Sequence, residues 1–332
     1  MDLVIAYNKP FLSIEEQRAL LVRRGMQVEN PDEADYYLRN EGYYRLSSYF
    51  HPFRRVGSDG KRLDAFVPEA NFEDVIRLYE FDKSLRTSML TVLRSVEISV
   101  RVAIAHHLGK KDIFAHENPS LLRYAFTHGE SNRRDKTWYQ VWLNKYHLLL
   151  ARDDQEDFVR SFIIKYGQKI PIWVAIEIWD FGLLSRFFGG MKFNDQQAVS
   201  RLYGVDDPNL FSTWLRTFNY VRNVCAHHSR LWNRNIVEQP RISQREPILL
   251  LKHLVTNKLK SPSSRIYATL ALVTYILRQM HRRNHTLWVK SIGLLLEEFP
   301  KCSSVSPEMM GFPRNWRELT LWRWEPAAPP QP

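Results

Sequence analysis

The longest helical pattern in the sequence lies between Asn71 and Gly109, and it limits the possible folds more than any other feature. Asn71 is a suitable N-cap and Gly109 a suitable stop, so one helix is predicted over residues 72–108. Apolar side chains recur there at spacings of three, four or seven residues and form one stripe, made of Val75, Leu78, Leu85, Met89, Val92, Val96 and Ala103. No strand-like alternation longer than a few residues occurs elsewhere, and no internal repeat is found. The sequence therefore predicts a mainly α fold, a helical bundle.

Capping signals predict where several other helices begin. Ser13 and Glu16 form a capping box that starts a helix ending near Arg24, and Asn30 followed by Pro31 starts a second. Residues 43–50 continue the helical pattern, and residues 56–70 are predicted to form a loop or a small hairpin. Further helices are expected over residues 138–152, 153–166, 172–188 and 208–230, and from a cap at Ser263 or Ser264 to about Met280.

The 172–188 segment is apolar nearly all round, apart from Glu177, Asp180 and Arg186, which places it at the centre of the protein. Residues 110–137 are expected to be loop with one short helix, and residues 281–325 are mixed. Four regions follow from these signals. They are an N-terminal helical and aromatic–basic region (1–70), a helical core (71–238), a C-terminal helical region (239–325) and a disordered tail (326–332).

The charge balance and the cysteine count narrow the function classes. Lys plus Arg is 47 against 36 for Asp plus Glu, a formal net charge of +11, which favours a polyanionic partner such as nucleic acid, although a membrane surface also fits. The two cysteines, Cys225 and Cys302, form no CxxC pair, which excludes a disulfide framework and a cysteine zinc site. No signal peptide and no run of eighteen apolar residues are present. We expect a soluble cytoplasmic protein without a membrane partner.

The helix predicted over residues 208–230 concentrates the groups that bind phosphates and move protons. On a helical wheel its core face carries Phe211, Trp214, Phe218, Val221 and Cys225. The opposite face carries Arg216, Tyr220, Asn223, His227 and Arg230. Asn223 and His227 are nearly in line, but Arg222 lies roughly 140° from His227 on a straight helix. Either the helix bends, or the arginine reaches across, or a second copy of the helix completes the site.

Arg222, Asn223 and His227 suit RNA cleavage. Histidine can take and give a proton at cellular pH, because its unperturbed pKa is near 6.5. RNA supplies its own nucleophile in the 2′-hydroxyl, and an arginine can neutralise the charge that develops on the phosphorus centre. Such a site needs neither a metal nor a cofactor, and we predict none.

Two other interpretations of this segment remain. His227 and His228 could ligate a metal, but adjacent histidines on a helix point about 100° apart and no nearby carboxylate completes a set. The segment could instead be a capped helix end with solvated histidine and arginine side chains. No Walker loop, GxSxG elbow or GxGxxG motif is present, which weakens nucleotide hydrolase, esterase and dehydrogenase interpretations.

Further residues are candidates for supporting roles. An aromatic patch with arginines around residues 43–50 could stack bases and bind phosphates, although ordinary core packing would also explain its tyrosines. The candidate RNA contacts are Tyr43, Tyr44, Arg45, Arg216, Tyr220, Arg230 and Arg234. Glu97 and Arg101 lie four residues apart and share a helix face. As a surface ion pair they would contribute only about 0.3–0.5 kcal/mol.

The segment Arg222-Asn-Val-Cys-Ala-His227 matches the R-x4-6-H signature of HEPN-domain ribonucleases, and the whole chain resembles the Abi family of bacterial abortive-infection proteins, the AbiD/AbiF group. The similarity covers most of the chain. It includes six segments in the family's order, at residues 9–11, 43–49, 79–86, 171–175, 222–234 and 310–316. A lone R-x4-H would be weak, but six ordered segments are specific.

The resemblance implies a HEPN-like helical bundle with additional N- and C-terminal helical segments. It also implies a homodimer, because two HEPN motifs meet in one site and this chain has a single motif. In that site Arg222 would bind the scissile phosphate, Asn223 would orient it, and His227 would act as general acid or base. His228 would be a second candidate histidine, and Glu97 with Arg101 would match an acidic position on an earlier helix.

The function expected from the resemblance is a metal-independent endoribonuclease in antiphage defence, with RNA as its target and a structured small RNA as a possible partner. The alternative is an RNA-binding protein of the same fold that sequesters a structured RNA without cutting it. A third class, a helical bundle for protein interaction, predicts no RNA affinity and is disfavoured by the charge.

Overall fold

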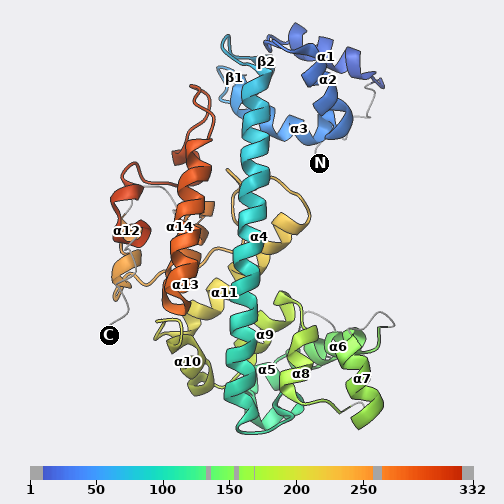
Figure 1. Ribbon diagram of the computed structural model, residues 1–332, viewed down its shortest axis with the longest axis vertical. Helices are drawn as coiled ribbons and strands as arrows, with labels where there is room; N and C mark the ends of the chain where they lie inside the picture. Colours follow the sequence, from blue (N-terminus) through green and yellow to red (C-terminus); the bar gives the residue numbers. More distant parts are fainter. Residues whose placement is uncertain (1–9, 132–135, 153–156, 168, 257–263, 324–332) are drawn as a thin grey trace. The chain divides into compact units, whose positions relative to one another are not determined.

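The computed structural model describes residues 10–131, 136–152, 157–167, 169–256 and 264–323. Within these ranges helices predominate and the only sheet is a two-stranded hairpin, which confirms the mainly α prediction (Figure 1). Residues 1–9, 153–156, Ser263 and the 326–332 tail carry predictions that fall outside the described ranges.

The chain forms two compact units. The N-terminal unit comprises residues 1–85 and 294–309, and the central unit comprises residues 86–293 and 310–332. The division falls inside the longest helix, between Leu85 and Arg86, whereas the boundaries expected at residues 70 and 238 stay predictions.

The elements follow in chain order. The N-terminal unit contains α1 (Ile14–Arg23), α2 (Pro31–Asn40), α3 (Tyr43–Phe50), β1 (Arg54–Val56), β2 (Arg62–Phe66) and the first part of α4 (Phe72–Gly109). The central unit contains the rest of α4, followed by α5 (Tyr124–Thr127), α6 (Trp138–Leu150), α7 (Asp157–Tyr166), α8 (Ile172–Ala175), α9 (Phe181–Gly190), α10 (Phe193–Arg201), α11 (Pro208–Ala226), α12 (His253–Thr256), α13 (Ile266–Met280) and most of α14 (Arg282–Glu297).

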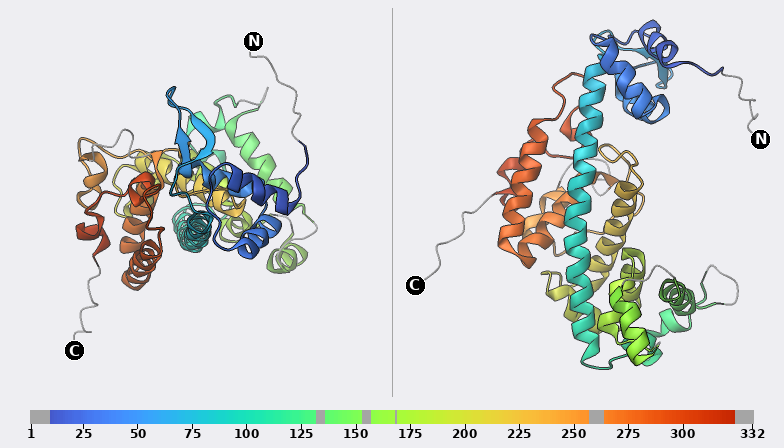
Figure 2. Two further views of the ribbon diagram at one scale, coloured as in Figure 1. Left: turned by 90° about the horizontal axis from the view of Figure 1, so that it is seen from above. Right: turned by 45° about the vertical axis from the view of Figure 1, so that its right-hand side comes forward.

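The capping signals of the N-terminal unit act as predicted. Ser13 accepts a hydrogen bond from the Glu16 backbone N–H, and the Glu16 carboxylate accepts one from the Ser13 N–H at 2.7 Å. Asn30 caps α2, with Pro31 at the first helical position. Strands β1 and β2 pair antiparallel, so the segment after α3 is a hairpin, seen in blue with α1–α3 in both views of Figure 2.

Helix α4 confirms the stripe read from the sequence. Six of its seven apolar positions are buried, namely Val75, Leu78, Leu85, Met89, Val92 and Val96, while Ala103 is half-buried. The helix includes Gly109, one residue beyond the predicted end. The stripe is thus the core-facing side of a helix that both units share.

The single helix predicted over residues 172–188 is wrong. Helix α8 ends at Ala175, one turn of 3-10 helix follows, and the backbone of Trp179 is extended (ψ 134°). Asp180 then acts as an N-cap and accepts a hydrogen bond from the Leu183 N–H at 2.7 Å, which starts α9. Aspartate favours caps over helix interiors, because its side chain competes for backbone N–H groups. Asp180, a polar residue within an apolar run, therefore marks the start of α9.

Helix α11 also ends earlier than predicted, at Ala226 rather than Arg230. His227 is its C-cap, and His228 has a left-handed backbone (φ 54°). The N–H of Ser229 donates to the Val224 carbonyl and that of His228 to the Cys225 carbonyl, both at 3.0 Å. This is a Schellman motif with histidine where glycine is usual. Because no glycine marks this position, no local sequence signal indicates where the helix ends.

Two further differences concern the C-terminal region. Ser264 does not cap α13, because Arg265 holds the N-cap position with no side-chain cap hydrogen bond, and the Ser264 carbonyl instead accepts the Ile236 N–H at 2.8 Å. Residues 281–325, predicted only as mixed, contain the 16-residue helix α14. Its polar first turn obscured the start of the helix.

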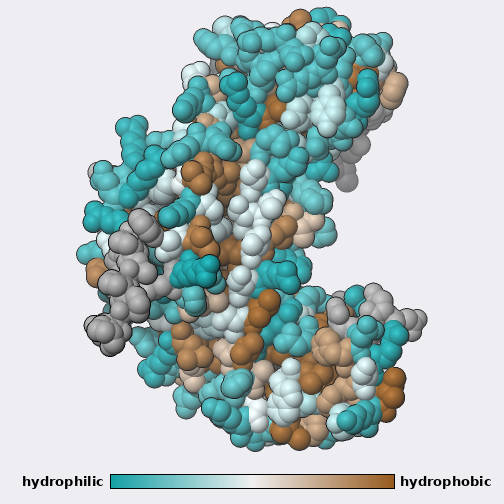
Figure 3. All heavy atoms as spheres, in the orientation of Figure 1, coloured by the Kyte–Doolittle hydropathy of each residue, from teal (hydrophilic) through white to brown (hydrophobic). Residues whose placement is uncertain are grey.

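The face shown in Figure 3 is mostly hydrophilic, with hydrophobic side chains (brown) gathered over its α5–α8 part. The exposed apolar or aromatic side chains of α6, α7 and α8 include Leu148, Ile164 and Trp173. No helix of the described residues combines the length and the apolar character that crossing a membrane requires.

Candidate functional site

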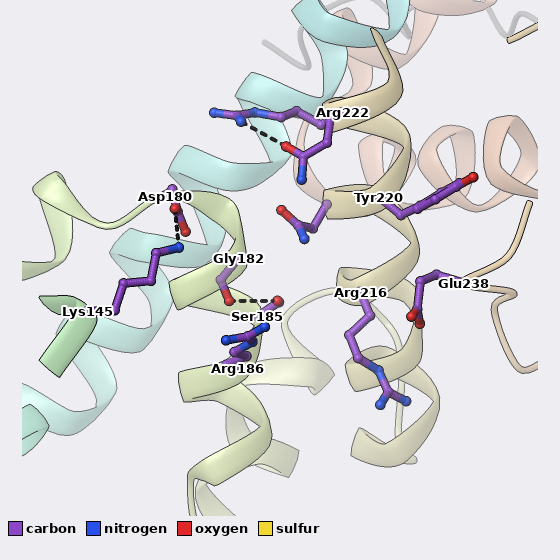
Figure 4. Close-up of a pocket in the computed structure, with 11 residues that line it drawn as sticks. Lys145, Asp180, Gly182, Ser185, Arg186, Arg216, Tyr220, Arg222 and Glu238 are labelled. Carbon is purple, nitrogen blue, oxygen red and sulfur yellow. Dashed lines mark hydrogen bonds and ion pairs between the residues drawn. The ribbon is translucent and has the colours of Figure 1, made fainter. Parts of the chain in front are cut away.

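The candidate site is a pocket of about 410 Å³ that lies where α9 and α11 pack side by side, which we call the α9–α11 pocket (Figure 4). Its lining is mainly polar and comes from α6, α9, α11 and the loop after α11. The lining residues are Lys145, Asp180, Gly182, Ser185, Arg186, Arg216, Asn219, Tyr220, Arg222, Asn223 and Glu238. All belong to the central unit. Packing of the apolar face of α11 positions this wall, since Phe211, Trp214, Phe218, Val221 and Cys225 are all buried, as predicted.

Arg222 and Asn223 lie together at the last turn of α11. The Arg222 Nη1 donates to the Asn223 Oδ1 at 3.0 Å, and both side chains are half-buried (Figure 4). Both line the α9–α11 pocket. The Asn223 amide therefore fixes one edge of the Arg222 guanidinium, whose other N–H groups can donate hydrogen bonds to an anion.

Asp180 forms the opposite wall of the pocket. Besides capping α9, it accepts a hydrogen bond from the Lys145 Nζ at 2.5 Å. Burial alone would raise the pKa of Asp180. The hydrogen bonds from Lys145 and the Leu183 N–H, together with the charges of Lys145 and Arg222, outweigh burial and lower this pKa. Asp180 is thus an ionised carboxylate facing Arg222.

Glu97 and Arg101 reach the same neighbourhood from α4. Arg101 donates to the Glu97 carboxylate and, at 2.6 Å, to the carbonyl oxygen of Trp179, the residue before the α9 cap. Glu97 is only 7% exposed, so this is not a surface ion pair. Burial raises the pKa of Glu97, and the charges of Arg101 and Arg222 oppose that rise. The pair ties α4 to the start of α9 and places a second carboxylate near Arg222.

His227 lies outside this arrangement. It is exposed at the C-cap of α11, and it is not among the described residues that line the α9–α11 pocket. The His227 N–H still donates to the Asn223 carbonyl at 3.0 Å, so the backbone of His227 follows Asn223 by one helical turn. His228 occupies the left-handed position of the turn. One chain thus places Arg222 and Asn223 on the pocket wall and His227 at the exposed end of the same helix.

The other predicted RNA contacts divide between the two units. In the central unit, Arg216 and Tyr220 line the α9–α11 pocket, and Arg234 donates to the Tyr220 hydroxyl at 3.0 Å and to the Arg230 carbonyl. In the N-terminal unit, Tyr43 accepts a hydrogen bond from Arg24 at 3.2 Å, Tyr44 is 92% exposed, and Arg45 is exposed on α3.

Sequence reasoning missed several residues of the pocket. Lys145 and Asn219 were not singled out, and Asp180 and Arg186 were noted only as polar residues of an apolar helix. The pairing of Lys145 with Asp180 joins positions 35 residues apart, which no local pattern reveals. The one usable signal was Asp180 itself, a favourable N-cap residue before an apolar run.

No group of three or more His, Cys, Asp or Glu side chains in the described ranges is placed to hold a metal ion. The donors that converge on the pocket are guanidinium, ammonium and amide groups, which bind anions. The arrangement is therefore suited to an anionic ligand.

Comparison with known proteins identifies the family. A sequence model of the family described as Abi-like protein matches residues 36–233, more than half of the chain, and this range includes α9, α11 and the Arg222–His227 segment. No curated protein matches, and no solved structure matches. On the strength of the family match, the chain belongs to the Abi-like proteins.

Proposed function

We propose that this protein is a metal-independent endoribonuclease that acts in abortive-infection defence against phage. Membership of the Abi-like family supports the defence role. The observation that carries the catalytic part is the Arg222–Asn223 pair in a cationic pocket, at the end of the helix that presents His227. The HEPN-type spacing of Arg222 and His227 links the pair to RNA cleavage.

The reaction follows from the groups present. The 2′-hydroxyl of the RNA attacks the adjacent phosphorus, a bond forms between the 2′-oxygen and phosphorus, and the bond to the 5′-oxygen breaks. One proton leaves the 2′-hydroxyl and one is delivered to the 5′-oxygen, a task for which histidine is suited near neutral pH. Arg222 neutralises the charge on the phosphoryl oxygens, while Asn223 holds the arginine fork in place. The products are a 2′,3′-cyclic phosphate and a 5′-hydroxyl.

A second copy of the chain completes the site in this proposal. His227 lies outside the pocket that holds Arg222 and Asn223, so it is available to a neighbouring copy. Two α11 ends in one homodimer would supply two histidines, one to accept the proton and one to donate it. The active species is therefore a dimer.

Cleavage of bacterial RNA in EDTA by the purified full-length protein is the test. We expect fragments that end in cyclic phosphate. His227→Ala should lose about 10²–10⁴-fold in rate as a proton-transfer group, and Arg222→Ala about 10²–10³-fold as a charge-stabilising group. His106→Ala is a matched control, since His106 is an exposed histidine on α4 outside the pocket. Full activity in both site variants, with unchanged melting, would refute the assignment.

The alternative is a protein that binds a structured RNA without cutting it. The exposure of His227, away from the pocket in one chain, is the observation that keeps this alternative in view. Co-purification of the same RNA with the wild type and with His227→Ala, with no fragments from either, would favour it.

A further inference from the structure

The charges that line the α9–α11 pocket do not balance. Four cationic side chains, Lys145, Arg186, Arg216 and Arg222, face two carboxylates, Asp180 and Glu238. Lys145 is bound to Asp180, and Arg222 is held by Asn223. The cations that remain are two arginines from the two helices that face each other.

Arg186 of α9 and Arg216 of α11 are both exposed, and within the described part of the chain neither guanidinium has a hydrogen-bond or ion-pair partner. Arg201 of α10, an exposed arginine that does not line this pocket, instead donates to Asp206 at 3.1 Å. Two like charges that line one pocket repel each other, and an anion bound beside both offsets that repulsion. Two guanidinium groups without a protein partner can therefore both bind an anionic ligand in this pocket.

The pocket's size and the chemistry of its walls narrow the ligand class. About 410 Å³ lies within the range of about 300–1,000 Å³ that holds a small molecule, and it is too small for a double helix. Asn219 and Ser185 add hydrogen-bonding groups to the pocket lining. Arg216 and Asn223 are seven residues apart, which corresponds to about 10 Å along α11. The pocket thus extends from the Arg222–Asn223 pair towards a second cationic end.

We propose that the α9–α11 pocket is a subsite for single-stranded RNA, in which Arg186 and Arg216 together bind a backbone phosphate next to the one that Arg222 engages. This inference rests on the proposed function for the identity of the ligand, and it adds a binding role for Arg186 that the catalytic proposal does not need. The subsite requires unpaired RNA, because the pocket is too small for a double helix.

Salt-dependent binding tests the subsite without requiring cleavage. The probe is a fluorescein-labelled oligouridylate of about 12 nucleotides, within the usual range of about 4–16 for single-strand binding sites. Its affinity is measured by anisotropy from about 50 to 300 mM KCl. Each phosphate contact contributes about 0.7 to the slope of log affinity against log salt. The affinity is to be compared for Arg186→Ala, Arg216→Ala and the double variant. All three are made in the full-length His227→Ala protein, so that the probe is not cleaved.

Each alanine variant should bind the probe several-fold more weakly. If both arginines hold the same phosphate, the double variant should lose about 0.7 of slope. Arg216→Lys should keep the slope, and Arg201→Ala, the matched control on α10, should change nothing. An RNA hairpin with a fully paired stem should compete poorly with the probe.

The outcomes separate this inference from the proposed function. If the arginine variants show altered salt slopes and the wild-type protein cuts no RNA, the subsite is supported and the nuclease is refuted. The subsite would be refuted, and the nuclease left standing, if the wild type cleaves RNA while the double variant keeps its affinity and salt slope in the His227→Ala protein and its KM in the protein that retains His227. Absence of salt-dependent binding, or equal competition by paired RNA, would overturn the subsite.

Discussion

Helices α3 and α11 both combine aromatic and arginine side chains, and both bury one face, but α11 lines the α9–α11 pocket and α3 does not. On α3 the buried face carries Leu46, Tyr49 and Phe50, while Tyr44 stands 92% exposed. Several arginines around α3 are bound to nearby carboxylates, as Arg24 is to Asp64 at 2.8 Å. On α11 the polar face is opposed by α9, and two arginines have no partner within the described residues.

The difference shows what an amphipathic helix needs in order to become a binding site. A basic and aromatic composition supplies affinity for RNA, but a pocket needs a second element whose polar residues face the first. Around α3, Arg24 and Arg54 both form ion pairs with Asp64. In the α9–α11 pocket the excess charge is held by the fold and left for a ligand.

The largest expected effect is on the free energy of unfolding, when a buried ring is removed from either helix. Phe218→Ala in α11 and Phe50→Ala in α3 each remove a fully buried ring and should lower the free energy of unfolding by about 3–5 kcal/mol. Denaturant titrations would measure both losses. At a temperature where both variants stay folded, only Phe218→Ala should weaken RNA binding, because Phe218 supports the wall of the pocket. Equal loss of affinity in both would remove the distinction between the helices.

The two units should also differ in how acid affects their stability. Burial lowers the pKa of His116 in the central unit to about 4, and His116 packs against Trp179, next to the α9 cap. Between pH 6.5 and about 4 the unfolded chain binds a proton that folded His116 does not. Stability is therefore lost as pH falls through this window, by about 3 kcal/mol at its lower end.

His116→Phe should remove this part of the acid sensitivity, seen as a pH-dependent difference in unfolding free energy between variant and wild type. His253, whose pKa is also lowered to about 4 by burial, stays in both proteins and cancels. The N-terminal unit contains a single histidine, His51, which is exposed, so it lacks a buried group of this kind. A difference that does not vary with pH would show that His116 is already protonated when folded.

The smallest effect concerns RNA affinity at α3. Tyr44 has no opposing wall, so Tyr44→Ala should lose about 1 kcal/mol, the lower end for stacking of one base. Arg45→Ala should change the salt slope less than the double variant of Arg186 and Arg216. Anisotropy with the same labelled oligonucleotide measures both. A larger loss at Tyr44 than in the α9–α11 pocket would move the principal RNA site to α3.

The parts of the fold that the sequence predicts well are those specified by neighbouring residues. Ser13 with Glu16 and Asn30 with Pro31 each act within one helical turn, and each pair begins a helix where predicted. Helix α11 also begins at residue 208 as predicted, with Asp207 as its N-cap. The buried face of α11 follows from the helical period alone. These signals do not depend on which helix packs against which.

The parts that the sequence could not give depend on tertiary contacts or on an unusual residue at a common position. His228 takes the left-handed position that glycine normally marks, so the end of α11 was placed four residues too late. Arg222 and His227 were identified by their spacing, but the opposing wall around Asp180 comes from distant segments. The candidate residues could therefore be proposed from the sequence, whereas the residues that enclose the pocket around Arg222 could not.

The turn at the end of α11 has a thermodynamic consequence for His227. The backbone of the histidine is tied to α11 on one side, and a few residues later Leu231 and Trp232 are fully buried. A short loop held at both ends has little conformational entropy left to lose. Ordering a catalytic loop on binding would otherwise cost about 0.5–1.5 kcal/mol for each immobilised side chain. Much of the ordering of this histidine thus takes place when the protein folds, before any RNA arrives.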